Sequence, residues 1–145
     1  MSKLSNRAEE LFYEGFNCSQ AVLGSFCEKY GMKQEDAFAI ATGLGGGIRC
    51  GEVCGAVSGA VLVIGLKYGN KNQNEGNSKA LCYAKTTEFI NRFKERKGSI
   101  VCRELLGYDL SKEGEMKEAA EKGVFKEVCP KMIKEAVEIL EELNY

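Results

Sequence analysis

Apolar residues recur at helical spacing along nearly the whole chain, and no run alternates apolar and polar residues as a half-buried strand does. Glycines mark the points at which these apolar stripes end. In Leu4–Glu14, for example, one stripe that includes Ala8 and Leu11 ends before Gly15. The pattern predicts an all-α fold over residues 1–145, a single-domain helical bundle of about six to eight helices around a Gly-rich central helix.

Caps and glycines set the limits of the predicted helices. Asn17 followed by Gln20 has the pattern of a capping box, and Pro130 favours a last helix that it begins, with Cys129 as the cap. A polar stretch, Asn70–Ser78, is expected to be a loop. The predicted helices are Leu4–Glu14, Asn17–Tyr30, Gln34–Thr42, Gly51–Tyr68, Ser78–Lys97, Ser99–Leu106, Glu113–Lys122 and Cys129–Leu143.

Composition and charge exclude several classes of partner. The chain has 20 Lys and Arg against 21 Asp and Glu, a net charge of −1, and so no excess of positive charge for nucleic acid or an anionic membrane. Its most apolar run, Val53–Leu66, is shorter than the roughly 18–20 residues that cross a membrane. The N-terminal segment lacks the apolar stretch of a secretory signal. We therefore expect a cytoplasmic protein that does not insert into membranes.

The chain has seven cysteines and no histidine, which limits the kinds of catalytic and metal site that it can form. Cysteine is about 5% of the chain, below the roughly 8–10% of disulfide scaffolds, and an odd number cannot pair completely within one chain. The absence of histidine excludes a Cys–His nucleophile pair, a mixed Cys/His zinc site and a c-type haem attachment. In a reducing cytosol the remaining roles are buried packing, catalysis and metal ligation.

Four of the seven cysteines lie at the predicted N-termini of four different helices. Unpaired N–H groups and the helix macrodipole stabilise a thiolate at that position, so we expect lowered thiol pKa values there. Arg49 and Arg103, next to cysteines in the sequence, would add to this effect. The four helix-start cysteines are Cys18, Cys54, Cys102 and Cys129.

The other three cysteines have different contexts. Cys50 and Cys54 form a CxxxC pair, one helical turn apart if Cys50 is already helical, and such a pair can form a disulfide or share a metal. Cys27 and Cys82 fall in helix interiors, where packing as small apolar residues is expected. Packing is the commoner role for any single cysteine, and the shared position of the four at helix starts is what favours chemistry.

Glycines in the central helix repeat every four residues. Gly51, Gly55 and Gly59 would leave one helix face almost without side chains. Such a face allows another helix backbone to approach closely, or leaves room for a ligand, which makes Gly55 and Gly59 candidate cofactor-binding positions. The run Gly45–Gly47 is expected to be a flexible entry loop whose N–H groups can face an anion, although no nucleotide-binding motif surrounds it.

The segment Cys54–Gly59 reads CGAVSG, a CGAxxG motif with cysteines before and after it. In a chain of this length it resembles the C-GCAxxG-C-C family, whose members carry the description redox-active, and the resemblance covers nearly the whole chain. Cys18 looks like the first cysteine of the family, Cys54 like the central one, Cys102 like the third and Cys129 like the fourth. The resemblance implies thiol chemistry at these four positions and leaves Cys27, Cys50 and Cys82 outside the pattern.

Three functions fit the sequence. The favoured one is thiol–disulfide chemistry by a pair among the four cysteines, or by Cys50 with Cys54, in a thiol-dependent oxidoreductase that needs no cofactor and whose partner is a redox protein or a small thiol. The second is an electron-transfer protein in which Cys18, Cys54, Cys102 and Cys129 bind an iron–sulfur cluster or zinc. The third is a non-catalytic bundle that binds a partner or a second copy of itself.

Overall fold

Eight α-helices make up most of residues 2–73 and 76–145, which are the residues that the computed structural model describes. In this part of the chain the only strand-like feature is one isolated β-bridge, so the all-α prediction is confirmed. The α-helices are α1 (Lys3–Tyr13), α2 (Cys18–Phe26), α3 (Gln34–Ala41), α4 (Gly55–Tyr68), α5 (Ser78–Lys97), α6 (Cys102–Leu106), α7 (Glu113–Glu121) and α8 (Val124–Glu142), and the shorter turns are η1 (Cys27–Tyr30), η2 (Thr42–Leu44) and η3 (Gly47–Gly51).

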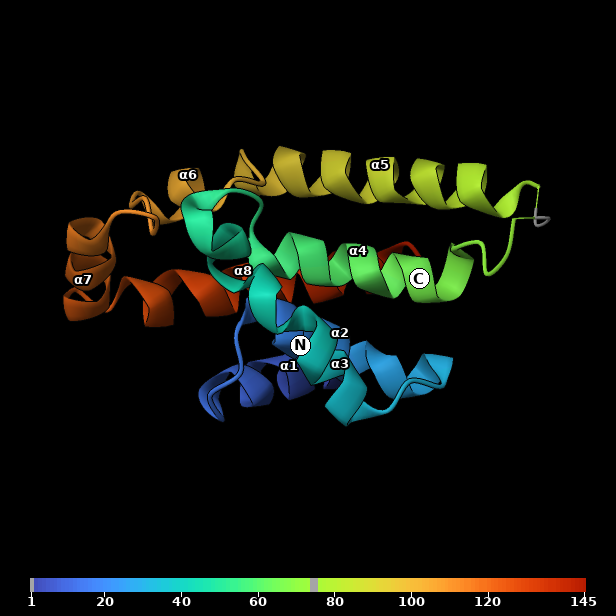
Figure 1. The fold of residues 1–145 in the computed structure, drawn as a ribbon, viewed down its shortest axis with the longest axis horizontal. Coiled ribbons are helices and arrows are strands. Elements are labelled where there is room, and N and C mark those ends of the chain that lie inside the picture. Colours follow the sequence, from blue (N-terminus) through green and yellow to red (C-terminus); the bar gives the residue numbers. More distant parts are fainter. Residues whose placement is uncertain (1, 74–75) are drawn as a thin grey trace.

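The central helix α4 lies between two groups of helices (Figure 1). The long helix α5 runs beside α4 on one side, and α1, α2 and α3 lie on the other. Helix α8 packs on α1, α2, α4 and α5 and so connects the two groups. Helix α7 lies at one end of the molecule, on the left in Figure 1, where it packs on α8.

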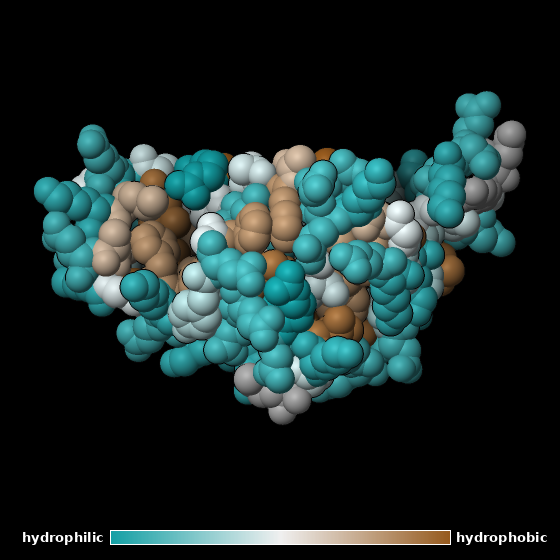
Figure 2. All heavy atoms as spheres, turned by 90° about the horizontal axis from the view of Figure 1, so that it is seen from below, coloured by the Kyte–Doolittle hydropathy of each residue, from teal (hydrophilic) through white to brown (hydrophobic). Residues whose placement is uncertain are grey.

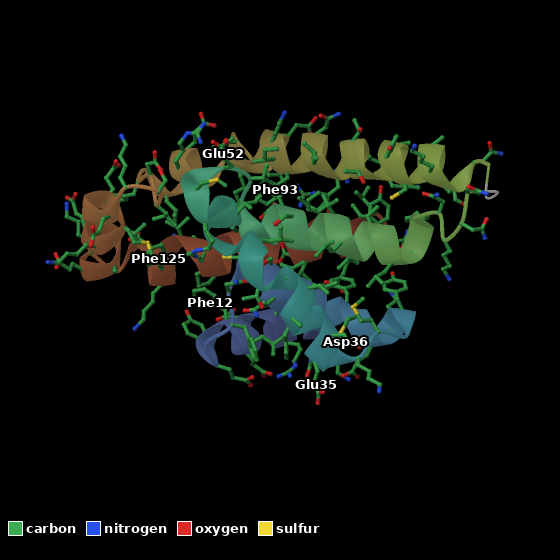
Figure 3. All side chains as sticks on the ribbon, viewed as in Figure 1. Phe12, Glu35, Asp36, Glu52, Phe93 and Phe125 are labelled. Atoms are coloured by element: carbon green, nitrogen blue, oxygen red, sulfur yellow. The ribbon has the colours of Figure 1, made fainter. Side chains whose placement is uncertain are left out.

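Two hydrophobic clusters fill the interior. The main cluster joins α1, α2, α4, α5 and α8 around fully buried side chains such as Phe93 and Ile133. Figure 3 shows Phe93 pointing into the space between α5 and α4, whereas Glu35 in the first turn of α3 points outward. The smaller cluster lies beside α6, α7 and the start of α8. Its buried members are Cys102, Leu106, Leu110 and Ala119.

Helices α2 and α4 approach closely because Gly55 and Gly59 present no side chain to α2. A Cβ atom at Gly59 would lie 2.8 Å from the carbonyl oxygen of Ser19, and one at Gly55 would lie 3.1 Å from the Cβ of Cys18. No larger residue fits against the backbone at Gly59. The predicted close approach of a second helix is therefore confirmed at these two glycines, while Gly51 lies before α4 begins.

Two predicted helices begin later than expected. Helix α4 begins at Gly55 and not at Gly51, because the backbone at Ile48, Arg49 and Gly51 has positive φ and cannot continue an α-helix. Helix α6 begins at Cys102 and not at Ser99, because the chain before it is extended and Val101 forms the isolated antiparallel bridge with Val53.

The prediction for the last helix is wrong at its N-terminus. Helix α8 begins at Val124, so Cys129 and Pro130 lie inside it and Cys129 is not a cap. Pro130 cannot donate a hydrogen bond to the carbonyl one turn earlier. The first turns of α8 still form because Val124, Phe125 and Val128 pack against the smaller cluster.

The surface is mostly hydrophilic with separate hydrophobic patches, as Figure 2 shows for one face. No helix in the described part of the chain is long and apolar enough to cross a membrane. The predicted polar loop 70–78 includes residues 74 and 75, which lie outside the described residues. The large hydrophobic residues that are exposed are Tyr13, Ile40, Ile48, Leu81 and Tyr83.

Candidate thiol site

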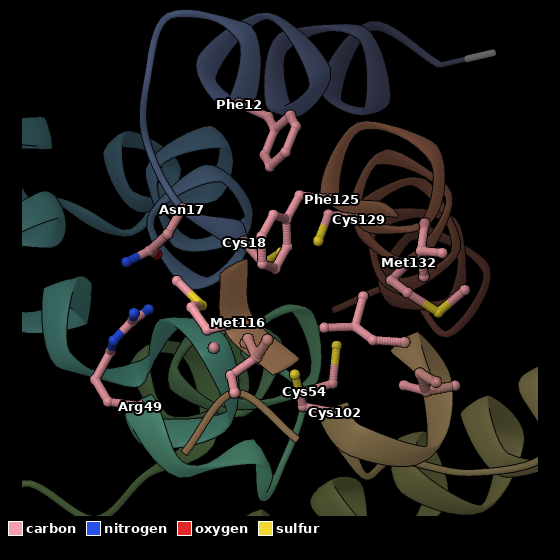
Figure 4. Close-up of a pocket in the computed structure, with 16 residues that line it drawn as sticks. Phe12, Asn17, Cys18, Arg49, Cys54, Cys102, Met116, Phe125, Cys129 and Met132 are labelled. Carbon is pink, nitrogen blue, oxygen red and sulfur yellow. The ribbon is translucent and has the colours of Figure 1, made fainter. Parts of the chain in front are cut away.

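Four cysteines from four helical elements line one cavity of about 230 Å³ (Figure 4). Each has a free thiol. Cys18 and Cys54 belong to the main hydrophobic cluster, Cys102 belongs to the smaller one, and Cys129 packs against both. The cavity therefore lies where the two clusters meet.

A short backbone pairing places Cys54 beside Cys102. The N–H of Cys54 donates to the carbonyl of Ile100 at 2.7 Å, and the N–H of Cys102 donates to the carbonyl of Glu52 at 2.5 Å. These two hydrogen bonds flank the antiparallel bridge between Val53 and Val101. Since side chains alternate along extended chains, both cysteines leave the bridge on the face opposite the two valines. Figure 4 shows their sulfur atoms next to each other.

The capping box at the start of α2 positions Cys18. The side-chain oxygen of Asn17 accepts from the N–H of Gln20 at 3.0 Å, and the side chain of Gln20 accepts from the N–H of Asn17 at 2.9 Å. The amide of Asn17 also donates to the carbonyl of Thr42 at 2.9 Å. With Gly55 of α4 against its Cβ, Cys18 is held as the first residue of α2 at the edge of the cavity.

Three helix starts surround the cavity. Cys18 is the first residue of α2, Cys54 is the N-cap of α4, and Cys102 is the first residue of α6. These three agree with the predicted position at helix starts. Cys129 reaches the same cavity from the interior of α8, where no free N–H groups of a helix start are available to it.

Burial overrides the expected effect of the helix starts on thiol acidity. It raises the pKa of Cys54 from 9.0 to about 11, although the N–H groups of Ala56 and Val57 act in the opposite direction. Burial also raises the pKa of Cys102, to about 12, with further contributions from the neighbouring thiols of Cys54 and Cys129. The prediction of lowered pKa values is therefore wrong for these two thiols.

Cys18 and Cys129 are two thiols of the cavity whose acidities differ. Interaction with the Cys18 thiol lowers the pKa of Cys129 and outweighs the opposing effect of burial. The same interaction, followed by burial, raises the pKa of Cys18 well above its ordinary value, so the predicted lowering is wrong for Cys18 as well. Cys129 is half-buried, whereas Cys18 is 8% exposed and Cys54 and Cys102 are each 6% exposed. Cys129 is thus both the most acidic and the most accessible of the four thiols.

The two arginines near the cysteines have different roles. Arg49 lines the cavity, and its charge lowers the pKa of Cys102 against the larger effect of burial. Arg103, although adjacent to Cys102 in the sequence, forms an ion pair with Glu52 at 2.8 Å and donates to the carbonyl of Gly51 at 3.2 Å. Of the two, only Arg49 faces the thiols.

The remaining three cysteines lie away from the cavity lining. Cys50 is exposed on η3, and its φ of −135° shows that it is not helical, so the predicted one-turn spacing from Cys54 does not hold. Its S–H donates to the carbonyl of Gly47 at 3.4 Å. Cys27 is buried in η1, and Cys82 is partly buried in α5 against the main cluster, as the packing interpretation predicts.

The sequence did not reveal the apolar wall of the cavity. Phe12 comes from α1, Met116 from α7, and Phe125 from the part of α8 that was not expected to be helical. Gly55 lines the cavity, whereas Gly59 contacts the backbone of Ser19 and does not. Within residues 2–73 and 76–145, no three Cys, Asp or Glu side chains are grouped so that they could hold a metal ion.

A family model described as "Putative redox-active protein (C_GCAxxG_C_C)" matches residues 16–143. The matched region contains all four cysteines that line the cavity, together with Arg49. No curated protein and no solved structure matches the chain. The resemblance seen at the motif around Cys54 is confirmed.

Proposed function

The chain belongs to the C_GCAxxG_C_C redox-active family, and from this membership we propose that it performs thiol–disulfide exchange through Cys129 and Cys18. The proposal depends on one observation above all, that two thiols of unequal acidity line the same cavity. Thiolates attack disulfides and neutral thiols do not, so the more acidic member of a pair is the one that attacks first.

Cys129 is the attacking residue in this proposal. Its pKa is lowered and its side chain is only half-buried, so of the four cavity thiols it is the one with the largest thiolate fraction and the one that an incoming molecule meets first. Cys54 and Cys102, with pKa values raised to about 11 and about 12, stay protonated at neutral pH and do not compete for the first step. Cys18 is next to Cys129 and is the resolving residue.

The proposed reaction has two exchange steps. The thiolate of Cys129 attacks one sulfur of a substrate disulfide, forming a mixed disulfide and releasing the other sulfur as a thiolate that takes up a proton. Cys18 then loses its proton and attacks the Cys129 sulfur, which forms the Cys18–Cys129 disulfide and releases the second substrate thiol. The substrate disulfide gains two electrons and two protons, and the protein dithiol loses them.

The proposal places the protein in a reducing compartment, the cytoplasm. Glutathione and thioredoxin systems keep cytoplasmic thiols reduced, so the pair would return to the dithiol after each oxidation. The same two steps in reverse would reduce the protein disulfide at the expense of a dithiol or two thiols.

Disulfide mapping tests this assignment. In a Cys50→Ser background, which removes the exposed thiol, the reduced protein is treated anaerobically with 2-hydroxyethyl disulfide and its peptides are mapped by mass spectrometry. We expect a Cys18–Cys129 disulfide, and in Cys18→Ser a mixed disulfide that stops at Cys129. Cys82→Ser, outside the cavity, serves as the control with an unchanged product. If all four cavity thiols stay reduced under conditions that oxidise a free thiol, the proposal is wrong.

A second candidate function is favoured by the convergence of four sulfur ligands on one cavity. Four thiolates are a suitable donor set for zinc or an iron–sulfur cluster, although the side chains would have to move closer together to bind it. Metal analysis and an absorption spectrum of anaerobically purified protein distinguish the two functions. A stoichiometric metal that is lost in Cys54→Ser and in Cys102→Ser would favour ligation over exchange.

A further inference from the structure

The cavity that holds the thiols has one charged side chain in its described lining, that of Arg49. The rest of the lining consists of the four cysteines, two glycines, Asn17 and apolar residues such as Phe12 and Phe125. A guanidinium beside an apolar cavity offers a binding site for a ligand that carries one negative charge and is otherwise apolar. The charge of this group acts on one of the thiols, that of Cys102.

The glycine loop holds Arg49 against the cavity. Gly46 and Gly47 have positive φ, and a Cβ atom at Gly46 would lie 2.6 Å from Nη1 of Arg49. Arg49 itself has a φ of 59°, which L-residues seldom adopt. The backbone therefore accepts an uncommon conformation that leaves room for this guanidinium beside the thiols.

Arg49 has no acidic partner among residues 2–73 and 76–145 within the 4.0 Å that defines an ion pair. Two acidic groups at the same loop, those of Glu52 and Asp109, are engaged elsewhere. Glu52 pairs with Arg103, and Asp109 accepts from the hydroxyl of Ser111 at 2.6 Å. The guanidinium of Arg49 makes one long hydrogen bond, 3.4 Å to the carbonyl of Gly45, which leaves most of its donors free for a ligand.

The volume of the cavity suits a small disulfide as the substrate. The cavity, at about 230 Å³, is slightly below the roughly 300–1,000 Å³ of drug-sized ligand sites. Three of its four thiols are more than nine-tenths buried, so Cys129 is the one thiol of the cavity that is open to a disulfide from outside. A small organic disulfide can enter and place its sulfur atoms against Cys129.

We infer that the substrate is a small disulfide that carries a carboxylate, bound by Arg49 while its S–S bond faces Cys129. This inference rests on the proposed thiol–disulfide exchange and adds the class of substrate to it. Arg binds carboxylates through two parallel N–H donors, so it would orient the molecule as well as attract it. The apolar wall formed by Phe12, Phe125 and Met116 would contact the hydrocarbon part of the substrate.

The test compares three disulfides of similar length that differ in charge: 3,3′-dithiodipropionate, which is anionic, 2-hydroxyethyl disulfide, which is neutral, and cystamine, which is cationic. The rate of Cys18–Cys129 oxidation is measured in the Cys50→Ser background and divided by the rate of the same disulfide with 2-mercaptoethanol, an uncharged reference thiol. We expect the anionic disulfide to be preferred over the neutral one by about tenfold, as one charge-assisted contact provides.

Substitutions assign the preference to Arg49. In Arg49→Gln we expect the ratio of the anionic to the neutral rate to fall to that of the uncatalysed reaction, and Arg49→Lys should restore part of the preference. Arg103→Gln is the matched control, because that arginine is paired with Glu52, and the preference should persist. Equal corrected rates for all three disulfides in the parent protein would overturn the inference alone. No oxidation by any of them would overturn the exchange function itself.

Discussion

The thiols of Cys18 and Cys129 line the same cavity and influence each other's pKa, although one begins α2 and the other lies inside α8. The interaction makes two chemically identical groups unequal, because one thiol keeps its proton and stabilises negative charge on its neighbour. An attacking and a resolving residue thus follow from a single interaction between two helices.

Removal of that interaction should change the acidity of Cys129. In Cys18→Ala, burial continues to raise the pKa of Cys129 while the interaction with the Cys18 thiol that lowers it is lost. We therefore expect the pH profile of Cys129 alkylation by iodoacetamide to shift to higher pH. The reaction is followed residue by residue with mass spectrometry. Cys82→Ala is the control, and an unshifted profile in Cys18→Ala would contradict the interaction.

Stability should fall in alkaline solution because of Cys54. Unfolded, its thiol loses a proton near the ordinary pKa of 9.0, whereas the folded protein holds that proton up to about 11. The stabilisation is fully present below pH 9 and is lost as the pH rises to 11, at about 1.4 kcal/mol per pH unit. Urea unfolding under reducing conditions, repeated over this pH range, measures this contribution as the difference in the free energy of unfolding between the parent protein and Cys54→Ser. A difference that does not change with pH would refute this account.

Alanine substitutions at Gly59 and Gly65 of α4 should change the free energy of unfolding in opposite directions, because the two glycines have different surroundings. Gly59→Ala places a methyl group 2.8 Å from the carbonyl oxygen of Ser19 and should lower the free energy of unfolding by about 1–3 kcal/mol. Gly65→Ala meets no atom within 4 Å and should raise it by up to about 1 kcal/mol through helix propensity. Denaturant unfolding of both variants, with the thiols reduced, gives the comparison. Equal effects would contradict the close packing of α2 on α4.

Backbone strain at Ile48 should be relieved by glycine. Ile48 is 50% exposed and has a φ of 59°, a conformation that is costly for a β-branched residue. Ile48→Gly should therefore stabilise the protein by roughly 1 kcal/mol. Ile40, which is 54% exposed in α3, is the matched control, because Ile40→Gly weakens a regular helix and should destabilise. Thermal unfolding of the two variants tests this prediction. Destabilisation by both substitutions would exclude strain at Ile48.

Local signals predicted much of the fold. The limits of α5 and the capping box of α2 agree with the sequence, since Gly98 ends one helix and Asn17 with Gln20 begins the other. The start of α8 was missed because Pro130 is a strong local signal, and packing of the preceding turns against the smaller cluster outweighs it. Long-range packing of that kind has no signature within a short window of sequence.

The sequence indicated the four cysteines that line the cavity, but not their acidity. Predicted helix starts indicated all four, which agrees with the structure for Cys18, Cys54 and Cys102, whereas Cys129 was included for a wrong reason, because it lies inside α8. Thiol acidity depends on burial and on which sulfur atoms are neighbours, and both are properties of the folded chain. The role of Arg49 likewise depends on the positive φ of its loop and on the pairing of Arg103 with Glu52.

The two hydrophobic clusters that meet at the cavity differ in size. The wall formed by the smaller cluster should therefore unfold locally more easily than the wall formed by the main cluster. Helix α7 contributes one fully buried residue, Ala119, and packs on α8, whereas the opposite wall belongs to the main cluster. Amide hydrogens of α7 should accordingly exchange with solvent faster than those of α4. Transient detachment of α7 would expose the buried thiol of Cys102 while the rest of the molecule stays native, so the stability of one short helix would set how far the cavity opens beyond Cys129.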